Sequence, residues 1–256
     1  MQPSPRTKPP NVAAILKQLR AAGTDRKRAS AVRVGIPMDK AYGVSVGVVR
    51  TIAKGLKGQH ALAEPLWATD IHEARLLATI IADANAVRRT DVERWLRDVV
   101  SWDLCDHLCG NLVRQRADAA NLVRRWIASE KLYVRRAAFA TIAELAVHNK
   151  TLNDNLLADF ADMIVEHGGD PRPHARQAAS WALRSIGKRD AANHDRALAA
   201  AAALLESDDA TKRWVGRDAM RELESLVKVP ERGRLLTSKS KTGRKEFRRA
   251  SRSRAL

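Results

Sequence analysis

Apolar residues recur at helical spacing from the first segment of the chain onward. In residues 11–22 these positions are Val12, Ile15, Leu16 and Leu19. They share one face of a helix that should end at Gly23. A glycine-containing loop follows over residues 35–47, and a second apolar face begins at Val48. Because no later segment alternates apolar and polar residues as a half-buried strand does, the sequence predicts an all-α fold.

Short polar breaks divide the rest of the chain into helices that share a pattern. The pattern is a polar turn, then basic or polar residues, then small Ala-rich residues. It occurs at His72–Ile80, Val134–Ile142, Arg176–Leu183 and Lys212–Arg217. The last two spacings approach the roughly 40-residue period of HEAT and armadillo units. We therefore expect a right-handed α-solenoid of HEAT-like helix pairs, with basic residues lining a concave face. A plain Ala-rich helical bundle is the alternative.

Composition sets three regions apart. Residues 1–10 are Pro-rich and should form a disordered leader, and residues 11–228 should form the solenoid. Residues 229–256 carry ten Lys or Arg and two Glu with little apolar content, so we expect a disordered basic tail. That tail would act either as a non-specific DNA tether or only as a solubilising segment.

The formal net charge of +17 indicates a polyanionic partner. DNA or RNA is the first expectation, and an anionic membrane surface is the second. No run approaches the roughly 20 apolar residues of a membrane span, and no apolar segment resembles a signal peptide. The two cysteines, Cys105 and Cys109, offer no disulfide framework. We therefore expect a soluble protein of the cytoplasm.

Residues 101–112 hold the most informative cluster of side chains. Ser101 suits a helix N-cap, and Asp103 suits the first helical turn. Trp102 and Asp106 are four residues apart, so they lie together on one flank of the helix, beside its apolar stripe. A Trp beside a carboxylate at the edge of a buried face is a candidate site. The alternative is a packing Trp and a solvated Asp.

Two further segments carry candidate residues. Arg135 and Arg136 stand at a predicted helix start, where they could form an ordinary solvated basic face. Trp181 lies in a helix of small residues, where a lone Trp more often packs in a core. A metal cluster of Cys105, His107 and Cys109 is disfavoured because His107 points away from both cysteines on a helix.

Taken together, these motifs resemble the AlkD-like family of HEAT-repeat DNA alkylation repair glycosylases. The Trp-Asp-x-x-Asp pattern of residues 102–106, Trp126 with Arg135-Arg136-Ala137-Ala138, and Ser180-Trp181-Ala182-Leu183-Arg184 follow in one order. The resemblance extends from about Ala29 to Leu226 and is strongest from Val99 to Ser185. Two departures stand out: Ser101 replaces a second Trp, and the loop of residues 43–46 lacks a Pro.

The resemblance implies excision of cationic N3- or N7-alkylated purines from double-stranded DNA, without a requirement for base flipping. It assigns the catalytic carboxylate to Asp106 and the two flanking aromatic rings to Trp102 and Trp181. It assigns the DNA backbone contact to Arg136, and we expect further backbone contacts from Arg135, Lys212 and Arg213. No metal or cofactor is needed, and we expect a monomer, associated with the nucleoid, that needs no protein partner.

Two other functions remain open from the residues. A non-catalytic HEAT-like DNA-binding or scaffold protein would keep the basic face without the chemistry, as some relatives of this fold do. A scaffold for protein partners fits the helices but not the charge of +17. Asp106 separates the first of these from an enzyme, because a carboxylate facing a phosphate backbone repels it.

Overall fold

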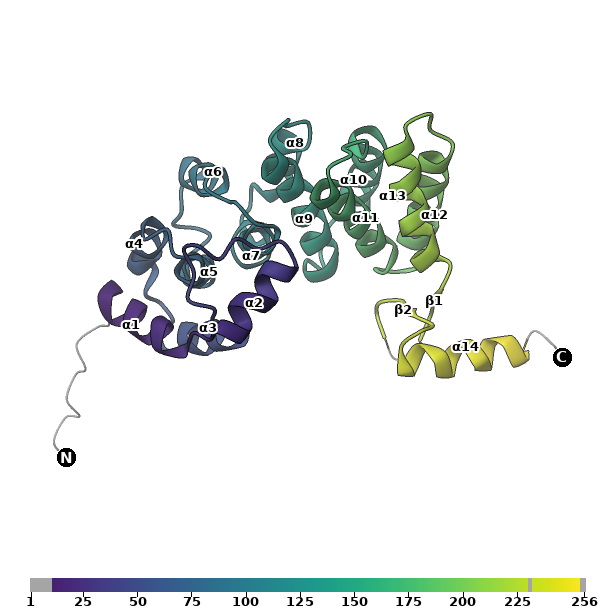
Figure 1. The fold of residues 1–256 in the computed structure, drawn as a ribbon. Helices are drawn as coiled ribbons and strands as arrows, with labels where there is room; N and C mark the ends of the chain where they lie inside the picture. The colour runs from purple at the N-terminus through teal and green to yellow at the C-terminus, as the bar shows by residue number, and fades with distance from the viewer. Residues whose placement is uncertain (1–10, 230–231, 254–256) are drawn as a thin grey trace. The chain divides into compact units, whose positions relative to one another are not determined.

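The computed structural model describes residues 11–229 and 232–253. The expected leader, residues 1–10, lies outside these described residues. Within them the fold is all-α, with fourteen α-helices, two short 3-10 helices and one pair of two-residue strands (Figure 1). This confirms the predicted fold class. The contacts divide the chain into two compact units, one ending at Arg116 and the next beginning at Ala117, where the sequence predicts a single domain.

The first unit is built around α5, a helix buried along most of its length. Its elements are α1 (Val12–Ala22), α2 (Asp25–Arg33), α3 (Val46–Lys54), η1 (His60–Leu62), α4 (Ala63–Ala68), α5 (His72–Ile81), α6 (Arg89–Arg97), α7 (Trp102–Asn111) and η2 (Val113–Gln115). Helix α5 packs against α3, α4 and α7. Its buried face includes Leu76, Leu77 and Ala78. The core therefore sits where α5 meets its neighbours, and α7 is positioned by it.

Local sequence explains why α1 was predictable and α2 was not. Asn11 caps α1 by accepting a hydrogen bond from the Ala14 amide, and Gly23 is the C-cap. Ile15 and Leu19 are its buried residues, as the apolar spacing predicts. Helix α2, by contrast, buries no residue at all, so it has no apolar stripe to read.

The second unit stacks three helix pairs. Its elements are α8 (Ala119–Trp126), α9 (Leu132–His148), α10 (Asp154–His167), α11 (Pro173–Gly187), α12 (Ala191–Leu205) and α13 (Ala210–Leu223). Helix α8 pairs with α9, α10 with α11, and α12 with α13. Helices α9, α11 and α13 also contact one another in succession, and α10 contacts α12. This is the two-layer packing expected of HEAT-like pairs (Figure 1).

Polar contacts recur at the repeat period in both units. In the first unit, partners 31 residues apart include Trp67 with Asp98 and His72 with Asp103. In the second unit, the separation is 38 residues for Arg136 with His174 and for Ser180 with Asp218. Equivalent positions of consecutive repeats therefore bond to each other, and the predicted period of roughly 40 residues fits the second unit.

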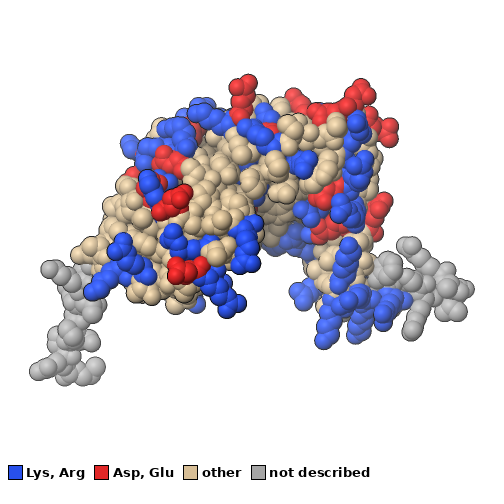
Figure 2. Space-filling model, viewed as in Figure 1, with Lys and Arg blue, Asp and Glu red and all other residues tan. Residues whose placement is uncertain are grey.

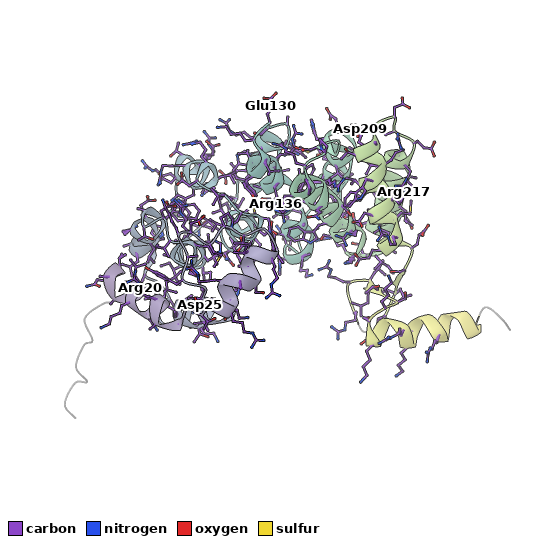
Figure 3. All side chains as sticks on the ribbon, in the orientation of Figure 1. Arg20, Asp25, Glu130, Arg136, Asp209 and Arg217 are labelled. Atoms are coloured by element: carbon purple, nitrogen blue, oxygen red, sulfur yellow. The ribbon has the colours of Figure 1, made fainter. Side chains whose placement is uncertain are left out.

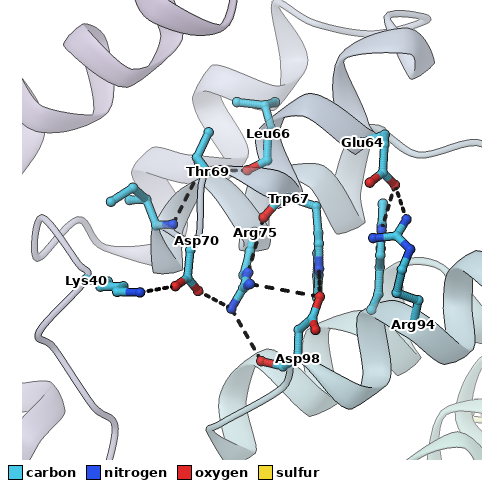
Figure 4. A network of polar contacts seen from close by, with 11 residues as sticks. Lys40, Glu64, Leu66, Trp67, Thr69, Asp70, Arg75, Arg94 and Asp98 are labelled. Atoms are coloured by element: carbon cyan, nitrogen blue, oxygen red, sulfur yellow. Dashed lines mark hydrogen bonds and ion pairs between the residues drawn. The ribbon is translucent and has the colours of Figure 1, made fainter.

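A network of ion pairs and aromatic rings shows how such repeats are joined (Figure 4). The rings of Trp67 and Trp95 stack with centroids 4.5 Å apart. Their indole nitrogens donate to Asp98 and to Glu64, at 2.8 Å and 2.9 Å. Arg75 lies over the Trp67 ring and pairs with Asp70, which also pairs with Lys40. Each buried indole N–H thus has a carboxylate acceptor, as burial requires.

The segment after α13 departs from the expected disordered tail. Strands β1 (Leu226–Val227) and β2 (Leu236–Thr237) pair antiparallel, and α14 (Lys241–Ser253) follows. Helix α14 packs on both strands. These elements could not be predicted from the sequence, because the strands are two residues long and α14 is almost entirely polar.

No helix among the described residues is long and apolar enough to cross a membrane.

Candidate active site

A cavity of about 510 Å³ in the first unit collects the side chains singled out on α7. Trp102, Asp103, Asp106 and His107 line it from α7. From the other sides it is lined by α2, by the loop of residues 43–46 and by His72, Glu73 and Leu76 of α5. The sequence predicted that Trp102 and Asp106 share one flank of a helix, and the structure places both on this one cavity.

Helix α7 begins at Trp102, and a hydrogen bond from the indole nitrogen holds this side chain in place. Its indole N–H donates to the carbonyl oxygen of Val34 at 2.9 Å, just beyond the end of α2. The side chain is partly exposed rather than buried in the core. The preceding residue, Ser101, holds the N-cap position that was predicted, but its side chain makes no capping hydrogen bond. The Trp102 ring is therefore oriented by α2, at a place where the residue lines the cavity.

Asp103 is held by a partner that the sequence did not reveal. His72 Nε2 lies 2.9 Å from Asp103 Oδ2, and both side chains are about nine-tenths buried. Burial opposes ionisation of Asp103, but the hydrogen bond and charge of His72 outweigh it and lower the pKa of the carboxyl. Asp103 is thus a carboxylate engaged by α5. Asp106, one turn of α7 away from Trp102, is the second carboxylate of this helix on the cavity.

His107, in contrast to Asp103, is held in its neutral form by its surroundings. Burial lowers the pKa of its imidazole, and the positive charge of Arg50 lowers it further, while Asp103 acts in the other direction. The imidazole is therefore neutral at pH 7. A neutral ring can donate a hydrogen bond from one nitrogen and accept at the other, so it can orient a water molecule in the cavity.

Glu73 builds the loop that forms one wall of the cavity. Its carboxylate accepts hydrogen bonds from the backbone amides of Tyr42, Gly43 and Val44, at 2.9, 2.7 and 3.0 Å. Glu73 is 1% exposed, so these bonds satisfy its buried carboxyl oxygens. Gly43 has φ of +79°, and a Cβ there would meet the Thr24 carbonyl oxygen at 2.5 Å. An acidic residue in the buried face of α5 was the available signal, and sequence reasoning missed it.

Arg136 lies in the second unit, on α9 (Figure 3). It is 5% exposed, and its Nη1 donates to the carbonyl oxygen of His174 on α11 at 2.6 Å. Burial and the charge of Arg136 lower the pKa of the His174 imidazole. This geometry gives Arg136 a positioning role between α9 and α11. The DNA backbone contact expected of it stays a prediction.

Arg135 is also engaged within the protein. Its Nη1 lies 3.0 Å from Asp170 Oδ2, and its Nε donates to the Ser129 carbonyl oxygen at 2.8 Å. Asp170 is buried, and Arg172, which bonds to it, lowers the pKa of its carboxyl despite the burial. Arg135 thus anchors the start of α9 to the turn before α11, and Arg136 anchors it to the first turn of α11.

The remaining predicted residues of the second unit lie on α11 and α13. Trp181 is partly exposed on α11, outside the core. Lys212 and Arg213 stand in the first turn of α13, and Arg213 Nη1 donates to the Ser207 carbonyl oxygen at 2.8 Å. Arg176, which the sequence did not single out, lies 4.4 Å from the Trp214 ring centroid. Helices α11 and α13 thus carry aromatic and positively charged side chains.

Cys105 and Cys109 are fully buried in α7. His107 lines the cavity instead. Across residues 11–229 and 232–253, no group of three or more His, Cys, Asp or Glu side chains could hold a metal ion.

Comparisons with known proteins agree with this picture. No curated protein matches the sequence. A solved structure described as "A new family of proteins related to the HEAT-like repeat DNA glycosylases with affinity for branched DNA structures" has a TM-score of 0.70 and 21% identity, over 94% of this chain and 95% of the other. It shows the fold. A family model described as "DNA alkylation repair enzyme" matches residues 15–223. The chain therefore belongs to the DNA alkylation repair enzyme family.

Proposed function

We propose that this protein is a DNA glycosylase that excises cationic N3- or N7-alkylated purines from duplex DNA, without requiring the base to be flipped. The observation that carries the proposal is the shared cavity of Trp102 and Asp106, in a chain of the DNA alkylation repair enzyme family. Asp106 is the carboxylate we assign to the chemistry, because it lies on this cavity beside Trp102 and matches the catalytic carboxylate in the family resemblance.

The proposed reaction needs no general acid. An N3- or N7-alkylated purine is already positively charged, so the C1′–N bond breaks with the electron pair leaving on a base that becomes neutral. The sugar passes through an oxocarbenium-like state, and Asp106 stabilises its positive charge. Water then adds to C1′ and gives up a proton, leaving an abasic site. The Trp102 ring attracts cations through its quadrupole and favours the charged base over a neutral one.

The residues of the second unit are proposed to hold the DNA. Trp181 would flank the lesion's backbone, and Lys212 and Arg213 would contact phosphates. Arg135 and Arg136 are assigned to this group as well, with the added task of fixing α9 against α11 through Asp170 and His174. The net charge of +17 supplies the long-range attraction to the duplex.

Substitution of Asp106 tests the proposal. Asp106→Asn keeps the side-chain volume but removes the charge, so we expect excision to fall by about 10²- to 10³-fold. Binding to undamaged duplex should be unchanged or tighter, because a negative charge near phosphates is removed. The matched control is Asp208→Asn, an exposed residue that does not line the cavity, and it should excise as the wild type does. Excision by Asp106→Asn at the wild-type rate would refute the assignment.

A second candidate is a DNA-binding protein that recognises branched DNA without excision. The solved structure with a TM-score of 0.70 belongs to proteins described as having affinity for branched DNA structures. The burial of Arg136 also suits a framework role better than a clamp on a lesion. This function predicts tighter binding to a four-way junction than to a duplex of equal length, and no release of base from methylated DNA.

A further inference from the structure

Helix α14 carries a stripe of exposed positive charge. Lys241, Arg244, Lys245 and Arg248 are all exposed, and Figure 2 shows Lys and Arg side chains gathered over this helix. Their spacing of three, four and seven residues places them on one face. At about 1.5 Å of rise per residue, the stripe is about 10 Å long. We call these four residues the α14 stripe.

The helix behind the stripe is docked rather than tethered. Ser240 accepts a hydrogen bond from the Gly243 amide at 3.0 Å and donates to the Thr237 carbonyl oxygen at 2.9 Å, which ties the start of α14 to β2. Gly243 is buried, and a Cβ at this position would overlap the same Thr237 carbonyl. Only glycine therefore lets α14 approach the strand this closely.

The strands are in turn fixed to the helices of the second unit. The Leu235 amide donates to the Lys188 carbonyl oxygen, just beyond α11, at 2.9 Å. The Ser238 amide donates to the Ser225 carbonyl oxygen, just beyond α13, at 2.7 Å. The α14 stripe is consequently held at a defined place on this unit.

The charges of the stripe are not balanced by the protein. Among the residues that the structure describes, none of the four has an ion-pair partner. Like charges three and four residues apart repel each other and disfavour the helix. Such a stripe is stabilised by an external polyanion. Helix α14 has one large apolar residue in its sequence, Phe247, which is too little for insertion into a membrane interface.

We propose that the α14 stripe is a second DNA contact, which binds the phosphates of duplex DNA independently of sequence and of damage. It rests on the proposed DNA-binding function but not on excision. The stripe adds affinity for undamaged duplex, on which the protein searches for its target. It is a preformed platform, in contrast to a flexible basic tail.

The first test neutralises the stripe in the full chain. Each phosphate contact contributes about 0.9 to the slope of log affinity against log salt. The variant Lys241→Gln, Arg244→Gln, Lys245→Gln, Arg248→Gln should therefore flatten that slope by about 3 to 4 on undamaged duplex. A control with the same charge change is Lys17→Gln, Lys54→Gln, Lys57→Gln, Arg97→Gln, four exposed residues of the first unit. An unchanged slope in the first variant, or an equal loss in both, would overturn the proposal.

Gly243→Ala separates a docked platform from a charged tail. The substitution keeps every charge but displaces α14 from β2, so affinity for duplex should fall at fixed salt. Affinity equal to the wild type would mean that a flexible tail suffices.

Vesicles of anionic lipid and single-stranded RNA provide competing partners, and a stripe effect confined to either of them would also refute the proposal. For the fourfold Gln variant and for Gly243→Ala, the excision rate at saturating methylated duplex should stay at the wild-type value. Loss of binding through the stripe is therefore measured separately from loss of glycosylase activity.

Discussion

Near Asp106, the surroundings of two titratable side chains, Asp103 and His107, determine whether each is charged or neutral. His72 keeps Asp103 ionised, whereas burial keeps His107 neutral. Helical spacing was enough to predict that Trp102 and Asp106 lie together. It could not predict His72 or Glu73, because both lie on α5 and bond to partners far away in the sequence. His72 bonds to Asp103 of α7, 31 residues away, and Glu73 bonds to backbone amides of the loop before α3. Contacts between repeats depend on the stacking of helices, which a single helical pattern does not contain.

The neutral state of His107 gives a testable pH dependence. An unfolded His has a pKa of about 6.5, whereas burial lowers the pKa in the folded protein. Below about pH 6.5 the unfolded chain therefore binds more protons, so the free energy of unfolding falls as the pH falls. His107→Gln should reduce this loss between about pH 7 and pH 5.

Urea unfolding at a series of pH values measures the effect. His174, whose pKa is also lowered, contributes in the same direction, so part of the dependence should remain. The lowered pKa of Asp103 matters at more acidic pH, because its stabilisation is lost only as the carboxyl becomes protonated. A variant with the full pH dependence of the wild type would show that His107 is not held neutral.

At the scale of elements, helices were predictable where a cap and an apolar stripe occur together. Asp209 caps α13, and Pro173 begins α11, both at breaks that the sequence marks. Helices α2 and α14 were not predictable. Helix α2 buries no residue, and α14 depends on its docking to β2 through Gly243. The formation of α14 is therefore decided by tertiary contacts, which outweigh local propensity.

Replacing glycine by alanine should change the free energy of unfolding in opposite directions at two positions. In α13, a Cβ at Gly216 would lie 2.8 Å from the Ala201 carbonyl oxygen and 2.9 Å from Leu204 Cβ of α12. Gly216→Ala should therefore lower the free energy of unfolding by about 1 to 2 kcal/mol, despite the better helix propensity of Ala. In α3, Gly47 is exposed, with its nearest neighbouring atom 4.0 Å from a Cβ. Gly47→Ala should raise it by up to about 1 kcal/mol.

Urea unfolding of both variants beside the wild type provides the measurement. Equal effects of the two substitutions would show that α12 and α13 do not rely on this close approach.

At the scale of the whole molecule, composition and repetition predicted the fold class, which the structure confirms, and the polyanionic partner stays a prediction from the charge. The Ala-rich helices pack in pairs, and polar bonds 38 residues apart join successive repeats of the second unit. The division at Arg116 into two units was not predicted, because residues 113–118 contain no proline or glycine that would mark a linker. Trp102 and Asp106 belong to the first unit, and Arg136 and Trp181 to the second. In the proposed enzyme, the residues assigned to excision thus belong to the first unit, and those assigned to DNA binding belong to the second.

Release of free base from methylated duplex DNA is the decisive measurement for glycosylase activity. The wild-type protein is incubated with duplex containing N7-methylguanine and N3-methyladenine, and with duplex containing uracil, a neutral base. Released bases are separated and identified by mass. We expect release of the two methylated purines, formation of abasic sites and retention of uracil, because only the cationic bases leave without a general acid. Salt-sensitive binding to the methylated duplex with no base released would contradict the glycosylase assignment.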